Sequence, residues 1–190
     1  PSNVSGGQEN CTNMSQPDRI VVLQDYADYS WGLDPTHYVI FEHLGTDSEE
    51  LQWANYRISE TPSKGVMMWG KMTYDYSLLL AGNTGANISR MGHQAHGFSA
   101  KRLMGYAESH DEERLMYNAY TNGNTGGSKP TFENLDNCLA RMSSIGAASL
   151  LIPGPKMIWH FADLGMENSI FTCTDGSVNT PSGGAAGDCK

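Results

Sequence analysis

The sequence lacks three features that would each point to a class of protein. No run of roughly 18 apolar residues occurs, so we expect no membrane-spanning segment. Basic residues are scarce, with 12 Lys and Arg against 21 Asp and Glu, and the net charge of −9 argues against a nucleic-acid partner or an anionic lipid surface. The four cysteines show no Cys-x-x-Cys spacing, so no zinc site is indicated.

What is present is the composition of a folded protein. Apolar residues make up 39% of the chain, and the 21 glycines bring the total to about half, the usual level for a globular core. A length of 190 residues suits one domain or a little more. The sequence begins at Pro1 and carries no signal peptide. We interpret it as an excerpt or a processed product, for which a missing signal peptide says nothing about export.

The cysteines lie in two kinds of surroundings. Cys138 falls in a helical pattern and is expected to be a small buried apolar residue. Cys173 and Cys189 flank a segment rich in Gly, Ser, Asp and Thr. They form either a disulfide that closes this segment, which would imply an oxidising compartment, or two unpaired thiols.

Short apolar runs alternate with helical patterns along the chain. The runs predict four strands, at 38–41, 65–69, 103–107 and 156–161. The helical patterns predict four helices, at 16–33, 47–58, about 74–80 and 133–151. Gly- and Asn-rich loops are predicted at 82–99 and 121–130. This alternation predicts an α/β fold with a parallel sheet.

Polar residues follow three of the predicted strands. Glu42 and His43 follow the first, residues 109–111 follow the third, and His160 and Asp163 lie at and just beyond the fourth. In parallel α/β folds the working residues lie at these carboxyl ends of the strands. We therefore expect a functional site to draw on these positions.

Two of these carboxyl groups suit opposite chemical roles. Glu42, directly after an apolar strand, is expected to be partly desolvated and so to keep a proton for donation. Asp111 is expected to stay ionised beside donors such as His110 or Arg114. Cleavage of a glycosidic bond needs two carboxyl groups in opposed environments.

Plainer interpretations compete with these. Glu42 could be a solvated loop residue or a helix-capping acid. Residues 108–114 could be the charged N-terminus of a helix, where acids favour the macrodipole. His93 and His96 are expected at the surface of a loop.

The roles of two tryptophans and two histidines also have more than one interpretation. Trp69 and Trp159 lie within or at the end of predicted strands and belong to the core, the rim or a sugar platform. His43 and His110 could ligate a metal, but no second close pair of ligands accompanies them, so no metal site is predicted.

Several segments resemble the α-amylase superfamily, family 13 of the glycoside hydrolases. Residues 106–114, Tyr-Ala-Glu-Ser-His-Asp-Glu-Glu-Arg, resemble its seventh-strand motif, which ends in His-Asp and is often followed by Arg. Residues 147–159 resemble its seventh helix running through Pro-Gly into the eighth strand, and 160–165 resemble the turn that follows. Residues 38–42 resemble the fifth strand with its general-acid Glu. The resemblance covers roughly residues 17–171.

The resemblance implies a partial (β/α)₈ TIM barrel, comprising about strands five to eight with their helices. Four strands cannot close a barrel of eight, and a whole barrel needs about 250 residues. Residues 17–171 would be the C-terminal half of the catalytic barrel. Residues 1–16 would be a loop or insertion, and 172–190 an irregular tail that a disulfide could close.

The resemblance also assigns roles to single residues. Glu42 matches the general acid/base, and Asp111 matches the third carboxylate, which stabilises the distorted sugar. His110 matches a histidine that hydrogen-bonds sugar hydroxyls, whereas the role of Arg114 is open. The side chains predicted to contact substrate are His43, Trp69, His110 and Arg114.

The chain also departs from the family pattern. The family's nucleophile is an Asp in a Gly-x-Arg-x-Asp motif, which does not occur in the 190 residues and by the order of elements belongs upstream of residue 1. Ser109 stands where many hydrolases carry Asn, and the same segment resembles α-glucan branching enzymes.

The resemblance therefore implies that the full-length protein is a retaining hydrolase of α-1,4-glucan links. The 190-residue piece alone is expected to be inactive. The alternatives are a branching transferase, a non-catalytic glucan-binding homologue, or an unrelated α/β fold. The expected partner is an α-glucan such as starch, and the expected location is extracellular or periplasmic. No organic cofactor is implied. Calcium is allowed by the family, although no Asp-rich calcium loop is visible.

Overall fold

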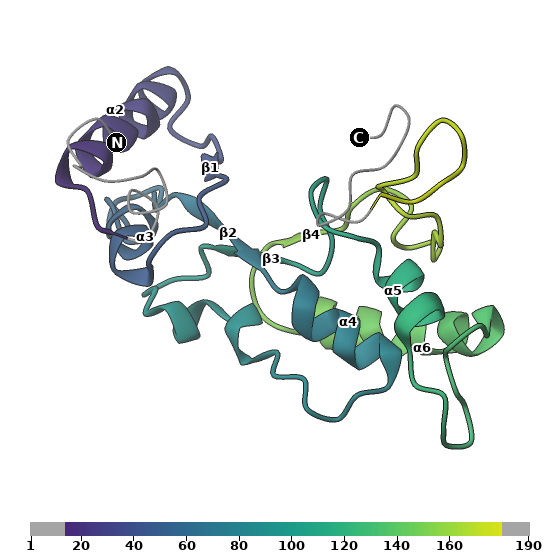
Figure 1. Cartoon of the computed structure of the whole chain (residues 1–190). Helices are drawn as coiled ribbons and strands as arrows, with labels where there is room; N and C mark the ends of the chain where they lie inside the picture. Colours follow the sequence, from purple (N-terminus) through teal and green to yellow (C-terminus); the bar gives the residue numbers. More distant parts are fainter. Residues whose placement is uncertain (1–13, 180–190) are drawn as a thin grey trace. The chain divides into compact units, whose positions relative to one another are not determined.

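The computed structural model describes residues 14–179 (Figure 1). These residues divide into two compact units. The first unit contains the described residues 14–71, 89–105 and 152–156. The second unit contains 72–88, 106–151 and 157–179.

The chain is an α/β protein with a four-stranded sheet. The strands are β1 (Ile40–Phe41), β2 (Met67–Lys71), β3 (Leu103–Tyr106) and β4 (Lys156–Met157). Their order in the sheet is β1-β2-β3-β4, so each strand lies beside the next one along the chain. β1 pairs with β2 in parallel. The four predicted strands are therefore confirmed.

Helices connect the strands, as a parallel arrangement requires. They are α2 (Pro17–Leu33), α3 (Asp47–Ala54), α4 (Thr73–Ala81), α5 (Leu115–Asn122) and α6 (Leu135–Leu150). The four predicted helices are confirmed, and α5 was not predicted. Two short 3₁₀ helices, Ser89–Met91 and His93–His96, interrupt the predicted loop at 82–99. Within residues 14–179, every helix falls short of the length and apolarity needed to span a bilayer.

Two strands differ from their predicted form. The fourth was expected to continue to Phe161, but β4 ends at Met157 and a series of turns follows, in which Phe161 takes a left-handed backbone conformation (φ 65°). The first was predicted at 38–41, but β1 contains only Ile40–Phe41. Val39, just before it, is buried and Ile40 is exposed, the alternation of an edge strand with one covered face.

The first unit has its hydrophobic core around two tryptophans. Trp31 of α2 and Trp53 of α3 are buried with Met68 of β2. The indole nitrogen of Trp53 donates to the Ile20 carbonyl at 3.0 Å, and that of Trp31 donates to the His37 carbonyl at 3.1 Å. These bonds satisfy polar groups that burial would otherwise leave unpaired, and they fix the approach to β1.

The second unit packs α4, α5 and α6 against one another. Tyr76 of α4 is fully buried, and its hydroxyl donates to the Ala148 carbonyl of α6 at 2.9 Å. Cys138 is a buried free thiol, as predicted. Cys173 is disulfide-bonded. The predicted partner, Cys189, lies outside the described residues.

Candidate active site

The loop between β3 and α5 carries four acids, and all of it belongs to the second unit. It leaves the sheet after Tyr106, which is fully buried, and enters α5 at Leu115. Its sequence runs Glu108-Ser-His-Asp-Glu-Glu-Arg114. The four acids have different surroundings, and this difference decides which of them can act on a ligand.

Glu108 ties the two ends of this loop together. Its Oε1 accepts a hydrogen bond from the Leu115 amide at 2.7 Å, and its Oε2 faces Nη1 of Arg114 at 3.3 Å. Both side chains are about 95% buried. A buried ion pair of this kind holds its surroundings in place, because removing either partner strands the other charge.

Two further acids of the loop are also bound by protein groups. Glu112 accepts a hydrogen bond from the Ser109 hydroxyl. Glu113 accepts from the Ile170 amide at 3.1 Å and from the Ser169 hydroxyl, which joins the loop to a segment beyond β4. Glu112 and Glu113 therefore have structural roles.

Asp111 differs from its neighbours because it faces solvent. Its side chain is 61% exposed and lies 3.2 Å from Nε2 of His110. The His110 ring lies 5.8 Å from the ring of Trp159, which follows β4. The ends of β3 and β4 thus bring together a carboxylate, an imidazole and an indole. Such a group can hydrogen-bond sugar hydroxyls and stack on a sugar ring.

Arg114 connects the two segments that carry these side chains. Besides its contact with Glu108, its Nη1 donates to the His160 carbonyl at 3.4 Å. Arg114 is buried, whereas the side chains of His110 and Asp111 reach solvent. The prediction that Arg114 contacts substrate stays a prediction, and its observed contacts are supporting ones.

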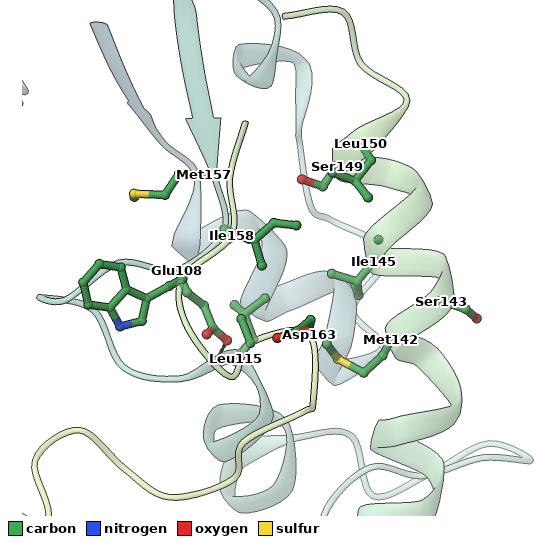
Figure 2. A pocket seen from close by; sticks show the side chains of 14 residues that line it. Glu108, Leu115, Met142, Ser143, Ile145, Ser149, Leu150, Met157, Ile158 and Asp163 are labelled. Atoms are coloured by element: carbon green, nitrogen blue, oxygen red, sulfur yellow. Dashed lines mark hydrogen bonds between the residues drawn. The ribbon is translucent and has the colours of Figure 1, made fainter. Parts of the chain in front are cut away.

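A cavity of about 290 Å³ lies behind the same strand ends, within the second unit. Apolar side chains dominate its lining, among them Leu115, Met142, Ile145 and Ile158 (Figure 2). Glu108 also lines it, and burial raises the pKa of this carboxyl, although the Leu115 amide and Arg114 act in the opposite direction. Sequence reasoning missed Glu108. Its position two residues beyond a buried strand was the feature of the sequence that could have indicated it.

The raised pKa of Glu108 predicts how stability depends on pH. Because folding favours the protonated carboxyl, the stabilisation is fully present below pH 4.5, the ordinary value, and is lost as pH rises through the folded pKa. The Glu108→Gln variant cannot ionise. We therefore expect its free energy of unfolding to rise relative to wild type from pH 4.5 toward neutrality, by about 1.4 kcal/mol for each unit by which the pKa is raised. Urea unfolding of both proteins at several pH values measures this, and a constant difference would contradict it.

Glu42 lies in the first unit, directly after β1. The expectation that it is partly desolvated is wrong for the described chain, since its side chain is exposed where β1 forms the edge of the sheet. Asp111 belongs to the second unit. The approach of these two carboxyl groups to one sugar therefore stays a prediction.

His43 is held by two buried carboxylates. Its Nε2 lies 3.3 Å from Glu49 and its Nδ1 lies 3.2 Å from Glu50, both on α3. Its ring also packs edge-on against Trp53, with ring centres 4.8 Å apart. With both nitrogens facing protein groups, His43 anchors the segment after Glu42 to α3. Its predicted contact with substrate stays a prediction, as does that of Trp69, which lies half-buried in β2.

His96 was expected at a loop surface, but it is buried. Its Nδ1 lies 2.8 Å from Asp47, and its Nε2 lies 2.9 Å from the Arg90 carbonyl. Asp47, Glu50 and His96 have ligand atoms within 4.8 Å of one another, the spacing of a metal site. However, the Arg90 guanidinium binds both oxygens of Asp47, at 2.7 and 2.9 Å. This cluster already contains its cation, so it does not fit the calcium ion that the resemblance allows.

Comparison with protein-family models and with curated proteins finds no match to this chain. The class that the fold defines is an α/β protein with a four-stranded parallel sheet and helical connections. The strand-end residues and the motifs that they form are therefore the features that indicate a function.

Proposed function

We propose that this chain is part of a retaining α-glucan hydrolase of the α-amylase type. The observation that carries the proposal is the exposed His110–Asp111 pair beside Trp159, supported by buried Glu108 and Arg114. A carboxylate and an imidazole side by side at a strand end, with an indole that follows the next strand, suit a site that binds and polarises a sugar.

The strand order supports the barrel part of the proposal. Neighbours in the chain are neighbours in the sheet, and each connection contains at least one helix. The (β/α)₈ barrel uses the same connectivity, so β1 to β4 are proposed as its strands five to eight.

In the proposed reaction two acids share the work of cleavage. Glu42 protonates the leaving glycosidic oxygen, an Asp upstream of residue 1 forms the glycosyl-enzyme, and Glu42 then activates water. Asp111 stabilises the positive charge that develops on the distorted sugar, while His110 hydrogen-bonds its hydroxyls. Retention requires about 5–5.5 Å between the carboxyl groups of Glu42 and the nucleophile.

A reducing-sugar assay on starch tests this proposal. The 190-residue chain should show no turnover, because its sequence contains no Gly-x-Arg-x-Asp motif. The protein extended upstream to include that motif should hydrolyse starch, and its Glu42→Gln variant should lose most of that activity. Clear turnover by the 190-residue chain would refute the assignment of the nucleophile to an upstream segment.

A non-catalytic glucan-binding protein is the second candidate. The observation that favours it is that His110, Asp111 and Trp159 all belong to the second unit, so they can bind a sugar without Glu42. It predicts that Glu42→Gln leaves binding of the extended protein to starch unchanged and that no hydrolysis is seen.

Formation of new α-1,6 links by the extended protein would instead identify a branching transferase.

The disulfide at Cys173 supports an extracellular or periplasmic location for the proposed enzyme, because disulfides persist in oxidising compartments.

A further inference from the structure

A second pocket, of about 290 Å³, lies in the first unit at the edge where the strands begin. Residues that lead into β1, β2 and β3 form it together with α2. The side chains that matter for its chemistry are Trp31, His37, Tyr38, Lys64 and Arg102. Glu42 follows the opposite end of β1, so this pocket is separate from the proposed catalytic positions.

The pocket is basic in an acidic protein. Among the described residues no Asp or Glu lines it, although the chain carries a net charge of −9. Lys64 is only 5% exposed. Asp34 and Glu60 interact electrostatically with Lys64, but both are exposed and neither lines the pocket. Lys64 and Arg102 thus line one pocket that no carboxylate of the described residues lines, which is costly unless a counter-charge is supplied.

Backbone carbonyls hold the two cations but do not neutralise them. The Lys64 ammonium donates to the Pro35 carbonyl and lies 5.7 Å from the Trp31 ring centre. Arg102 donates through Nε and Nη2 to the Lys64 carbonyl, at 2.8 and 2.6 Å. Its Nη1 takes part in neither bond. Burial lowers the pKa of Arg102, the direction expected for a guanidinium that lacks a close counter-charge.

Gly65 permits Arg102 to lie close to the backbone at the pocket wall. Its φ of +89° lies in the left-handed region, and a Cβ there would approach the Ala54 carbonyl to 2.5 Å and Nε of Arg102 to 3.0 Å. A side chain at this position would therefore displace Arg102 from the pocket wall.

We propose that this pocket binds a small oxyanion, the phosphate or carboxylate group of a small metabolite. Arg102 Nη1 and the remaining donors of Lys64 would contact the oxyanion, with His37, which also lines the pocket, as a third contact. Trp31 and Tyr38 would flank the body of the ligand. Planar and ammonium cations together are the usual protein donors to phosphate and carboxylate groups.

Isothermal titration of the 190-residue chain with inorganic phosphate tests this, with chloride at matched ionic strength as the reference. We expect phosphate to bind with a Kd on the order of 1 mM, equivalent to about −4 kcal/mol. Lys64→Gln and Arg102→Gln should each weaken binding about tenfold, since each removes a charged hydrogen bond. A parallel titration with acetate distinguishes a carboxylate ligand from a phosphate ligand.

Arg57→Gln is the matched control. Its guanidinium also lies 5.7 Å from the Trp31 ring, but it is bound by Asp28 and Glu60 and does not line the pocket. Its loss should leave phosphate binding unchanged. The proposal is overturned if this variant loses as much affinity as Arg102→Gln, or if neither phosphate nor acetate binds better than chloride.

A variant of the exposed His37 tests the proposal if Lys64→Gln and Arg102→Gln fail to fold. His37 lines the pocket and is exposed, so His37→Asn should fold normally. A several-fold weaker binding of phosphate by this variant supports the proposal, and an unchanged affinity opposes it.

Discussion

Under the proposed function, Asp111→Asn is expected to lower kcat of the complete protein on starch by roughly 10³-fold, the size of effect seen when one preorganised transition-state contact is removed. The amide keeps the shape of the carboxylate and can still contact His110, but it cannot stabilise positive charge on the sugar. Because Asp111 is 61% exposed, we expect the free energy of unfolding to change by less than about 0.5 kcal/mol. Initial rates on starch and urea unfolding measure the two quantities.

Asp136→Asn is the matched control for that variant. Asp136 is an exposed acid in the first turn of α6, in the same unit, and has no part in the proposed site. Its kcat should equal that of wild type. A fall of less than tenfold for Asp111→Asn would remove Asp111 from the proposed mechanism, while a large loss of stability would mean that its role is structural.

Glu108→Ala is expected to reduce the free energy of unfolding by about 3 kcal/mol or more. The substitution removes the acceptor of the Leu115 amide and leaves the Arg114 guanidinium, about 95% buried, without its carboxylate. The loop would then lose its closure, so the proposed hydrolase activity of the complete protein should also fall. Urea unfolding at neutral pH measures the stability change.

Glu108→Gln separates shape from charge in the same experiment. It keeps an acceptor for Leu115 and fills the same volume, so it should stay within about 1 kcal/mol of wild type at neutral pH. If Glu108→Ala proved as stable as Glu108→Gln, the hydrogen-bond acceptor at position 108 would not be what holds the loop.

The strand pattern was readable from the sequence because short apolar runs between loop residues leave few alternatives. All four strands and four of the five described helices were predicted. The fifth, α5, was not predicted because the sequence analysis interpreted only the charged run 108–114 that precedes it. Leu115, Met116 and Ala119 repeat at helical spacing directly after it.

The site was predicted less completely, because burial depends on contacts that are distant in sequence. The motif indicated His110 and Asp111, and the structure places them side by side. It did not indicate that Glu108 would be buried, since this depends on side chains of α6 that lie more than thirty residues away. The anchoring of His43 by α3 likewise required the fold.

The loop after β3 separates the residues that maintain its conformation from those that a ligand can meet. Glu108, Glu112, Glu113 and Arg114 hold it from within, whereas His110 and Asp111 point outward. Substitutions at the outward positions should therefore change ligand binding or catalysis while the fold is retained. A protein built in this way tolerates functional change at these two positions without first gaining extra stability.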